Sequence, residues 1–139
     1  MIELDNNTSL QINENLLNSI LLSLSNKEIE LLIVDENEMQ NINKQQRGID
    51  KSTDVLSFPY EDMPLAPLGS IVISSNHVRM KAKELSHTTD DEATLLFIHG
   101  LLHLLGYDHE IDNGEMRNKE AELIQKFGLP KSLIIRTQG

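Results

Sequence analysis

The sequence predicts an α+β fold: a single compact domain with a small mixed β-sheet and helices packed around it. The chain has 139 residues, the usual size of one domain, and its 39 % apolar and 24 % charged residues are typical of a globular protein. Strand and helix patterns alternate along the chain, and at least one strand-to-strand link is long enough to cross over through a helix. We therefore expect one domain over residues 1–139, with residues 130–139 as a C-terminal tail.

The N-terminal part of the chain predicts a helix, a strand and a second helix. Apolar residues recur at helical spacing over residues 13–24, and residues 28–34 end in a run of Ile, Leu and Val that is typical of a buried strand. Asp35 followed by Glu38 is the pattern of a reciprocally capped helix start. This second helix is expected to end near Arg47.

The middle of the chain predicts two strands and a short helix. Residues 53–58 have the pattern of a strand that Pro59 closes, and the proline-containing segment 61–67 is expected to be a loop. Residues 68–74 contain the apolar run Ile71-Val72-Ile73 and predict another strand, and residues 78–85 predict a short polar helix.

The C-terminal part predicts two helices. Thr89 or Asp90 could cap a helix that runs to Leu105 and stops at Gly106. Apolar residues surround this helix, which indicates that it is buried. A last helix is expected over residues 112–127.

The overall charge and the lack of cysteine narrow the classes of function. A formal net charge of -10 argues against a strong non-specific nucleic-acid binder, although a local basic patch could still attract a polyanion. The chain contains no cysteine, so any metal must be held by nitrogen and oxygen ligands. No apolar stretch reaches the roughly 18 residues of a membrane span, and the acidic N-terminus has no signal pattern, so a cytoplasmic protein is expected.

Three histidines at the end of the buried helix have the spacing of metal ligands. His99 and His103 are four residues apart, which places both imidazoles on one helix face. Gly106 can end the helix and let the chain bring His109 to the same point. Three neutral histidines leave a fourth position open for water, which is the catalytic pattern of zinc. We expect one Zn²⁺ ion here, although nickel or another divalent ion also accepts imidazole.

A plainer interpretation treats each histidine as a hydrogen-bonded core residue. Burial of three imidazoles without partners is costly, so three of the chain's five histidines on one buried helix and its exit favour a metal. His77 and His87 have polar neighbours in sequence and are expected at the surface. Gly100 stands where a zinc peptidase has its general base, Glu, so this zincin-like helix lacks the proton acceptor of peptidolysis.

Around the three histidines of residues 99–109, the sequence resembles the YbeY family of bacterial metal-dependent endoribonucleases. Residues 99–109 match the family's His-Gly-x-x-His-Leu-x-Gly-[Tyr/Phe]-Asp-His run. Arg47-Gly48 followed by Thr-Asp-Val-Leu-Ser-Phe-Pro at 53–59 matches a second family motif, and residues 68–74 match a third. Ser70 departs from this third motif, in which many members have Asp, and we do not assign it to the site.

The resemblance implies an α+β hydrolase with zinc on His99, His103 and His109. It further implies cleavage of single-stranded RNA in the maturation of the 16S ribosomal RNA 3′ end and in ribosome quality control. The expected partners are therefore ribosomal RNA, the small ribosomal subunit and its associated factors, with no DNA and no membrane. Arg47 matches an arginine that the family is held to need for activity.

The expected mechanism starts from water activated by zinc. Zinc-bound hydroxide, or a ribose 2′-hydroxyl that it activates, would attack the phosphodiester while Arg47 binds two phosphate oxygens. Asp54 or Asp108 could orient a ligand imidazole. The plainer alternatives are that Arg47 is a surface charge and that Asp108 only shapes the turn.

No residue stands out in the sequence as a general base. Two rival functions therefore stay open, an atypical metallopeptidase and a non-catalytic zinc-containing factor associated with the ribosome.

Overall fold

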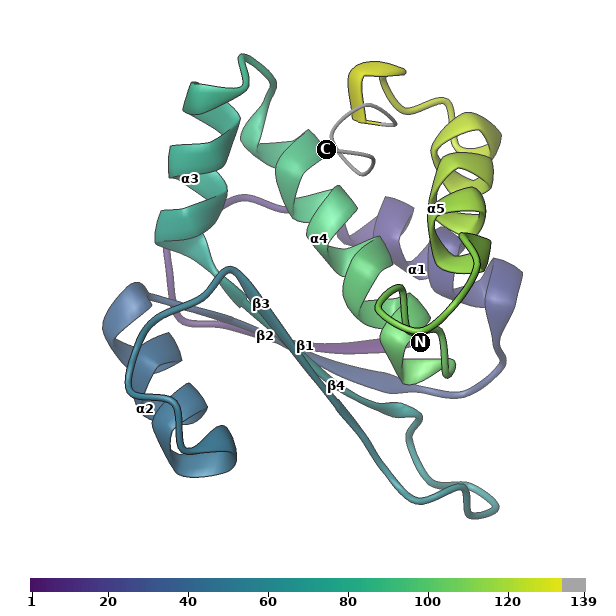
Figure 1. Cartoon of the computed structure of the whole chain (residues 1–139), viewed down its shortest axis with the longest axis horizontal. Helices are drawn as coiled ribbons and strands as arrows, with labels where there is room; N and C mark the ends of the chain where they lie inside the picture. Colours follow the sequence, from purple (N-terminus) through teal and green to yellow (C-terminus); the bar gives the residue numbers. More distant parts are fainter. Residues whose placement is uncertain (134–139) are drawn as a thin grey trace.

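The computed structural model describes residues 1–133 and confirms the α+β fold, with a mixed sheet that carries helices on both faces (Figure 1). The strand order is β1-β2-β4-β3. Strands β1 (Ile2–Asn6), β2 (Ile29–Val34) and β4 (Gly69–Ser74) run parallel, and β3 (Val55–Pro59) runs antiparallel to β4 at the edge. A helical crossover is present at the N-terminus, where α1 (Glu14–Leu24) joins β1, a strand that the sequence did not predict, to the parallel strand β2.

Two cores of different size lie on the two faces of the sheet. On one side lie α1, α3 (Ser75–Glu84), α4 (Thr89–Leu104) and α5 (Glu115–Lys126), and α2 (Glu36–Arg47) lies on the other (Figure 1). Side chains alternate along β4: Ile71 and Ile73 belong to the main core, whereas Val72 belongs to the smaller core under α2. Helix α4 packs against both β3 and β4, so it runs through the middle of the main core.

Local capping explains most of the helix boundaries. The Asp35 carboxylate accepts the backbone N–H of Glu38 at 2.8 Å, as the sequence predicts, and Gly48 ends α2 at φ 71°. The expected cap of α4 is wrong by one or two residues. Thr88 is the N-cap, since its backbone is extended and its hydroxyl accepts the N–H of Asp91 at 3.0 Å. Thr89 is already helical.

The sequence analysis missed β1. Glu3 and Asp5 are exposed on this edge strand, and only Ile2 is fully buried, so the apolar signal is weak. Residues 134–139 of the expected tail lie outside the described residues, whereas Leu133 is buried against Leu95 and Ile124.

The surface position expected for His87 is also wrong. Only 7 % of its side chain is exposed, and its Nε2 lies 2.8 Å from Oε1 of the fully buried Glu92. A buried acid thus compensates the buried imidazole. His77 is half-buried, with Nδ1 2.9 Å from the hydroxyl of Ser74.

Candidate metal centre

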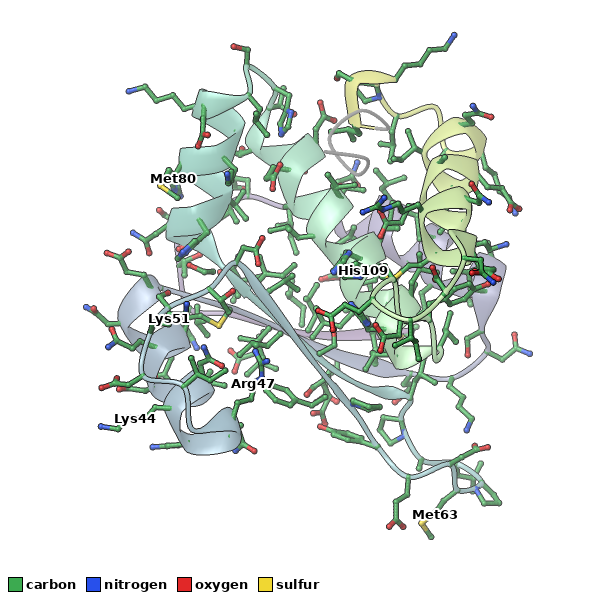
Figure 2. All side chains as sticks on the ribbon, in the orientation of Figure 1. Lys44, Arg47, Lys51, Met63, Met80 and His109 are labelled. Atoms are coloured by element: carbon green, nitrogen blue, oxygen red, sulfur yellow. The ribbon has the colours of Figure 1, made fainter. Side chains whose placement is uncertain are left out.

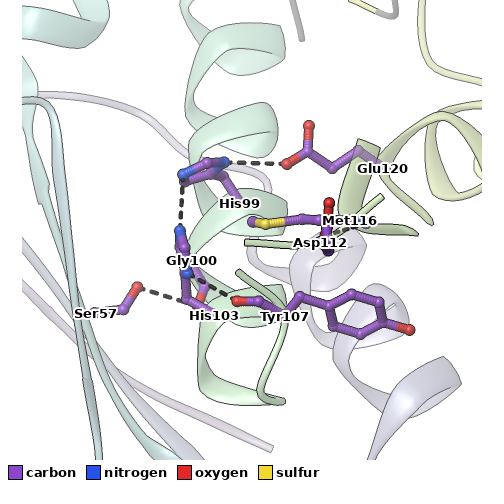
Figure 3. Close-up of polar contacts among 8 residues, drawn as sticks. All are labelled: Ser57, His99, Gly100, His103, Tyr107, Asp112, Met116 and Glu120. Atoms are coloured by element: carbon purple, nitrogen blue, oxygen red, sulfur yellow. Dashed lines mark hydrogen bonds and ion pairs between the residues drawn. The ribbon is translucent and has the colours of Figure 1, made fainter. Parts of the chain in front are cut away.

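Helix α4 presents two of the three predicted ligands. His99 and His103 lie one turn apart with their imidazoles on the same side of the helix (Figure 3). Their Nε2 atoms are 3.2 Å apart, and the ring planes meet at 79°. Because the rest of α4 is enclosed by the main core, the helix holds these two rings on a rigid support.

A tight turn after α4 returns the third histidine to the same place. Gly106 adopts φ 98° and donates its N–H to the carbonyl of His103, and Tyr107 donates to the carbonyl of Leu102, both at 3.0 Å. The centroid of the His109 ring then lies 5.5 Å from that of His99 and 5.8 Å from that of His103. The three histidines each offer a ring nitrogen within 4.8 Å of the others, so the predicted ligand set converges on one point.

Two hydrogen bonds fix the orientation of the rings on α4. Nδ1 of His99 lies 3.0 Å from Oε1 of Glu120, and Nδ1 of His103 lies 3.0 Å from the carbonyl oxygen of Tyr107 (Figure 3). A carboxylate and a carbonyl both accept, so each Nδ1 carries the proton. The Nε2 atom of each neutral ring then carries a lone pair that faces the other ring.

The donor chemistry of this cluster fits a divalent ion that prefers nitrogen. Two nitrogen lone pairs at 3.2 Å repel one another unless a cation or an extra proton lies between them. An extra proton is disfavoured, because burial and the neighbouring His99 lower the pKa of His103 against the opposing effect of the Tyr107 carbonyl. Three neutral imidazoles are ligands that suit zinc.

The site opens into a cleft of about 490 Å³ that lies over the outer edge of β3. Arg47 lines this cleft together with His99 and His103. The arginine lies at the exposed end of α2, and its Nη1 is 3.5 Å from Oδ1 of Asn43 (Figure 2). Helices α2 and α4 cover opposite faces of the sheet (Figure 1), and the edge strand β3 also lines the cleft through Val55, Leu56 and Ser57. The structure thus brings Arg47 and the predicted ligands to one cleft.

The two predicted orienting carboxylates line the same cleft but have other partners. Asp54 accepts the N–H of Val55 at 2.7 Å, and Asp108 accepts the N–H of Glu110 at 3.0 Å. Within residues 1–133, neither carboxylate forms a hydrogen bond with His99, His103 or His109. Their role in orienting a ligand stays a prediction.

Sequence reasoning missed Glu120, which is the acid that contacts a ligand ring. Its contact with His99 spans 21 residues of sequence, so local spacing does not reveal it. The available signal was a lone acid on the inner face of α5, whose other members are apolar.

The geometry explains why Gly100 replaces the peptidase glutamate. A Cβ atom at this position would lie 2.9 Å from Cγ2 of Ile71 and 3.1 Å from the Ser57 hydroxyl. The position therefore faces the sheet, and the Ser57 hydroxyl donates to the Gly100 carbonyl at 3.1 Å. A longer side chain has no room there.

Ser70 lies away from the histidines. It alternates with Ile71 along β4 and so points to the α2 face of the sheet, where its hydroxyl contacts Tyr60. Tyr60 also donates to Glu30 at 2.7 Å, and this hydrogen bond is the main reason that the pKa of Tyr60 is raised.

An α+β fold in which three histidines converge beside a cleft lined by Arg47 defines a candidate metal-binding site. The family model described as "Endoribonuclease YbeY" matches residues 2–128, and the chain belongs to this YbeY family.

Relatives named "Endoribonuclease YbeY" align along the whole chain. The protein from Sulfurimonas denitrificans is 61 % identical over 139 residues, which cover 100 % of both chains. The protein from Nautilia profundicola is 56 % identical over 138 residues and 99 % of both chains. A Thermotoga maritima protein solved in solution superposes with a TM-score of 0.64 at 28 % identity, and the match covers 91 % of this chain and 89 % of that one. No helix among residues 1–133 is long and apolar enough to cross a membrane.

Proposed function

We propose that this protein is a metal-dependent endoribonuclease that cleaves single-stranded RNA during maturation of the 16S ribosomal RNA 3′ end and in ribosome quality control. The observation that carries the proposal is the convergence of His99, His103 and His109 beside a cleft that Arg47 lines. The relatives that align along the whole chain and are named endoribonucleases support the choice of RNA as substrate.

The three imidazoles are proposed to hold one zinc ion. When bound, such an ion supplies a Lewis acid and lowers the pKa of a coordinated water toward about 7. The hydrogen bonds of the two Nδ1 atoms keep both Nε2 lone pairs of α4 turned toward the ion. His109, which is exposed on the turn after α4, completes the set of three ligands.

Arg47 is proposed to bind the scissile phosphate. The guanidinium donates to two phosphate oxygens at once and offsets the charge that grows there as water or a ribose 2′-hydroxyl attacks. Its weak contact with Asn43, at 3.5 Å, leaves donors free for such a ligand. Removal of one such stabilising donor costs on the order of 10²–10³ in rate.

The proposed activity also implies the partners of the protein and the compartment in which it works. Ribosomal RNA and the small subunit are the proposed partners, and the cytoplasm, where ribosomes mature, is the proposed compartment. The packing around Gly100 disfavours peptidolysis, since a glutamate at this position would clash with the sheet.

The proposal is tested with a labelled single-stranded RNA and four identically purified proteins: the parent, Arg47→Ala, His103→Ala and Lys44→Ala. Lys44 is the matched control, because it lies exposed one turn before Arg47 on α2 and does not line the cleft. We expect cleavage by the parent and by Lys44→Ala, and a loss of about 10²–10³ for Arg47→Ala. Equal cleavage by all four proteins would indicate a contaminant. No cleavage by any of them would favour a non-catalytic zinc factor, and cleavage of a peptide library would favour the metallopeptidase.

A further inference from the structure

An acid occupies the apolar inner face of α5. Met116, Leu123 and Ile124 on this face are buried, and Glu120 shares it with only 5 % of its side chain exposed. A carboxylate at such a position loses its hydration and lowers stability unless a strong partner compensates. A leucine there would pack α5 on α4 without this cost. Packing of α5 on α4 therefore does not explain why Glu120 is a glutamate.

The partner of this acid is one of the predicted metal ligands. Oε1 of Glu120 lies 3.0 Å from Nδ1 of His99, on the side of the ring that faces away from His103 (Figure 3). Among residues 1–133, no lysine or arginine forms an ion pair with Glu120. The carboxylate is thus aimed at the imidazole of His99.

We infer that Glu120 is a positioning residue of the metal site, one that fixes how His99 offers its lone pair. By accepting a hydrogen bond from Nδ1–H, the carboxylate excludes the tautomer that is protonated at Nε2 and prevents rotation of the ring. Its negative charge also makes the Nε2 lone pair a stronger donor to a cation. The inference rests on the proposed function, because it assigns Glu120 to the metal of that site.

The two ligands on α4 are supported by acceptors of different strength. His103 donates to a neutral backbone carbonyl, that of Tyr107, whereas His99 donates to a full charge. Helix α5 therefore contributes to metal affinity although it carries none of the three histidines.

A purely structural tie between α4 and α5 would have the same geometry, and the chain contains a matched control for it. Glu92 and His87 form another buried carboxylate–imidazole contact, at 2.8 Å, near the start of α4. Glu92→Gln removes a buried charge of the same kind at a pair that is separate from the three histidines. Glu122→Gln controls for a lost charge on the exposed face of α5.

The test measures the zinc affinity of the full chain by competition with a chromophoric chelator, and the unfolding midpoint of each metal-free variant. We expect Glu120→Gln to weaken zinc binding about 10-fold, because the amide still accepts a hydrogen bond but lacks the charge, and Glu120→Ala to weaken it up to about 100-fold. Glu92→Gln and Glu122→Gln should bind zinc within about twofold of the parent. The inference would be overturned if Glu120→Gln and Glu92→Gln bound zinc equally well. This holds if both variants bind zinc like the parent, and also if both lose zinc affinity together with a lower unfolding midpoint.

A measurement on the parent protein needs no variant. Long-range ¹H–¹⁵N correlation of the zinc-loaded chain should show His99 protonated at Nδ1, and protonation at the other nitrogen would contradict the inference. If the parent itself binds no zinc, the proposed metal site fails and this inference fails with it. If the parent binds zinc and Glu120→Gln binds it equally well, only the role of Glu120 fails.

Discussion

At the scale of single residues, the position after the first histidine shows how packing restricts chemistry. Alanine normally stabilises a helix interior by roughly 1 kcal/mol relative to glycine. At Gly100 we expect the opposite sign, because the added Cβ would lie 2.9 Å from Cγ2 of Ile71. Gly100→Ala should lower the free energy of unfolding by about 1–3 kcal/mol, the usual cost of overpacking. Urea denaturation measures this change, and a more stable variant would mean that the sheet yields to the methyl group without cost.

The residue scale also shows which parts of the site can be predicted from sequence. The three histidines were predictable because an i, i+4 pair and a glycine-ended helix are local patterns, and Arg47 was found only through the family resemblance. Glu120 was missed because its partner lies 21 residues away and on another helix. Asp108 was chosen because it is next to His109 in sequence, and Asp54 because it lies in the second family motif, yet both carboxylates accept nearby backbone N–H groups.

At the scale of elements, the start of α4 depends on one hydroxyl. Thr88 accepts the N–H of Asp91 at 3.0 Å, and this satisfies one of the free donors at the helix end. Thr88→Ala should therefore destabilise the protein by about 0.5–2 kcal/mol. Thr89→Ala is the matched control, because Thr89 is the first helical residue and does not cap. Thermal or urea unfolding compares the two variants. A larger effect of Thr89→Ala would place the cap where the sequence analysis expected it.

Element prediction failed where one face of an element gives little apolar signal. Strand β1 has acids at Glu3 and Asp5 on its exposed positions, and its pairing with β2 is set by the parallel register rather than by a hairpin. The boundaries of α2 were predicted well, because Asp35 and Gly48 are specific capping residues. Capping residues make the ends of a helix predictable from local sequence. An edge strand instead forms by pairing with a strand that is distant in sequence.

At the scale of the whole molecule, the net charge of -10 limits how this protein can hold RNA. Arg47 is the one lysine or arginine among the cleft-lining residues of the described chain. Affinity for a single strand falls with salt by about 0.7 log units per log unit for each phosphate neutralised. We therefore expect a plot of log affinity against log salt concentration to have a shallow slope of about -0.7 to -2. Arg47→Ala should make this slope shallower by about 0.7. Fluorescence anisotropy over a salt series measures the slope. A value steeper than about -4 would mean that basic residues outside the cleft bind the strand.

The last prediction concerns what zinc does for the whole fold. The main core draws on the sheet and on α1, α3, α4 and α5, and none of the three histidines belongs to it. The metal-free protein should therefore fold and unfold cooperatively, unlike a structural zinc domain. Zinc at about 100 times its dissociation constant adds about 2.7 kcal/mol to the stability of the native state. For a chain of this size, that corresponds to a rise of roughly 5–11 °C in Tm.

Calorimetry with and without a chelator separates the catalytic from the structural interpretation of the metal. His103→Ala is expected to keep a cooperative transition near the Tm of the metal-free parent and to lose most of the zinc-dependent rise, because it removes one of the two rings on α4 that face each other at 3.2 Å. If the metal-free parent and His103→Ala were instead unfolded at 25 °C, zinc would hold the fold together. The cleft beside Arg47 would then need another explanation, and the non-catalytic factor would become the better account, since a site built for catalysis can lose its metal without loss of its fold.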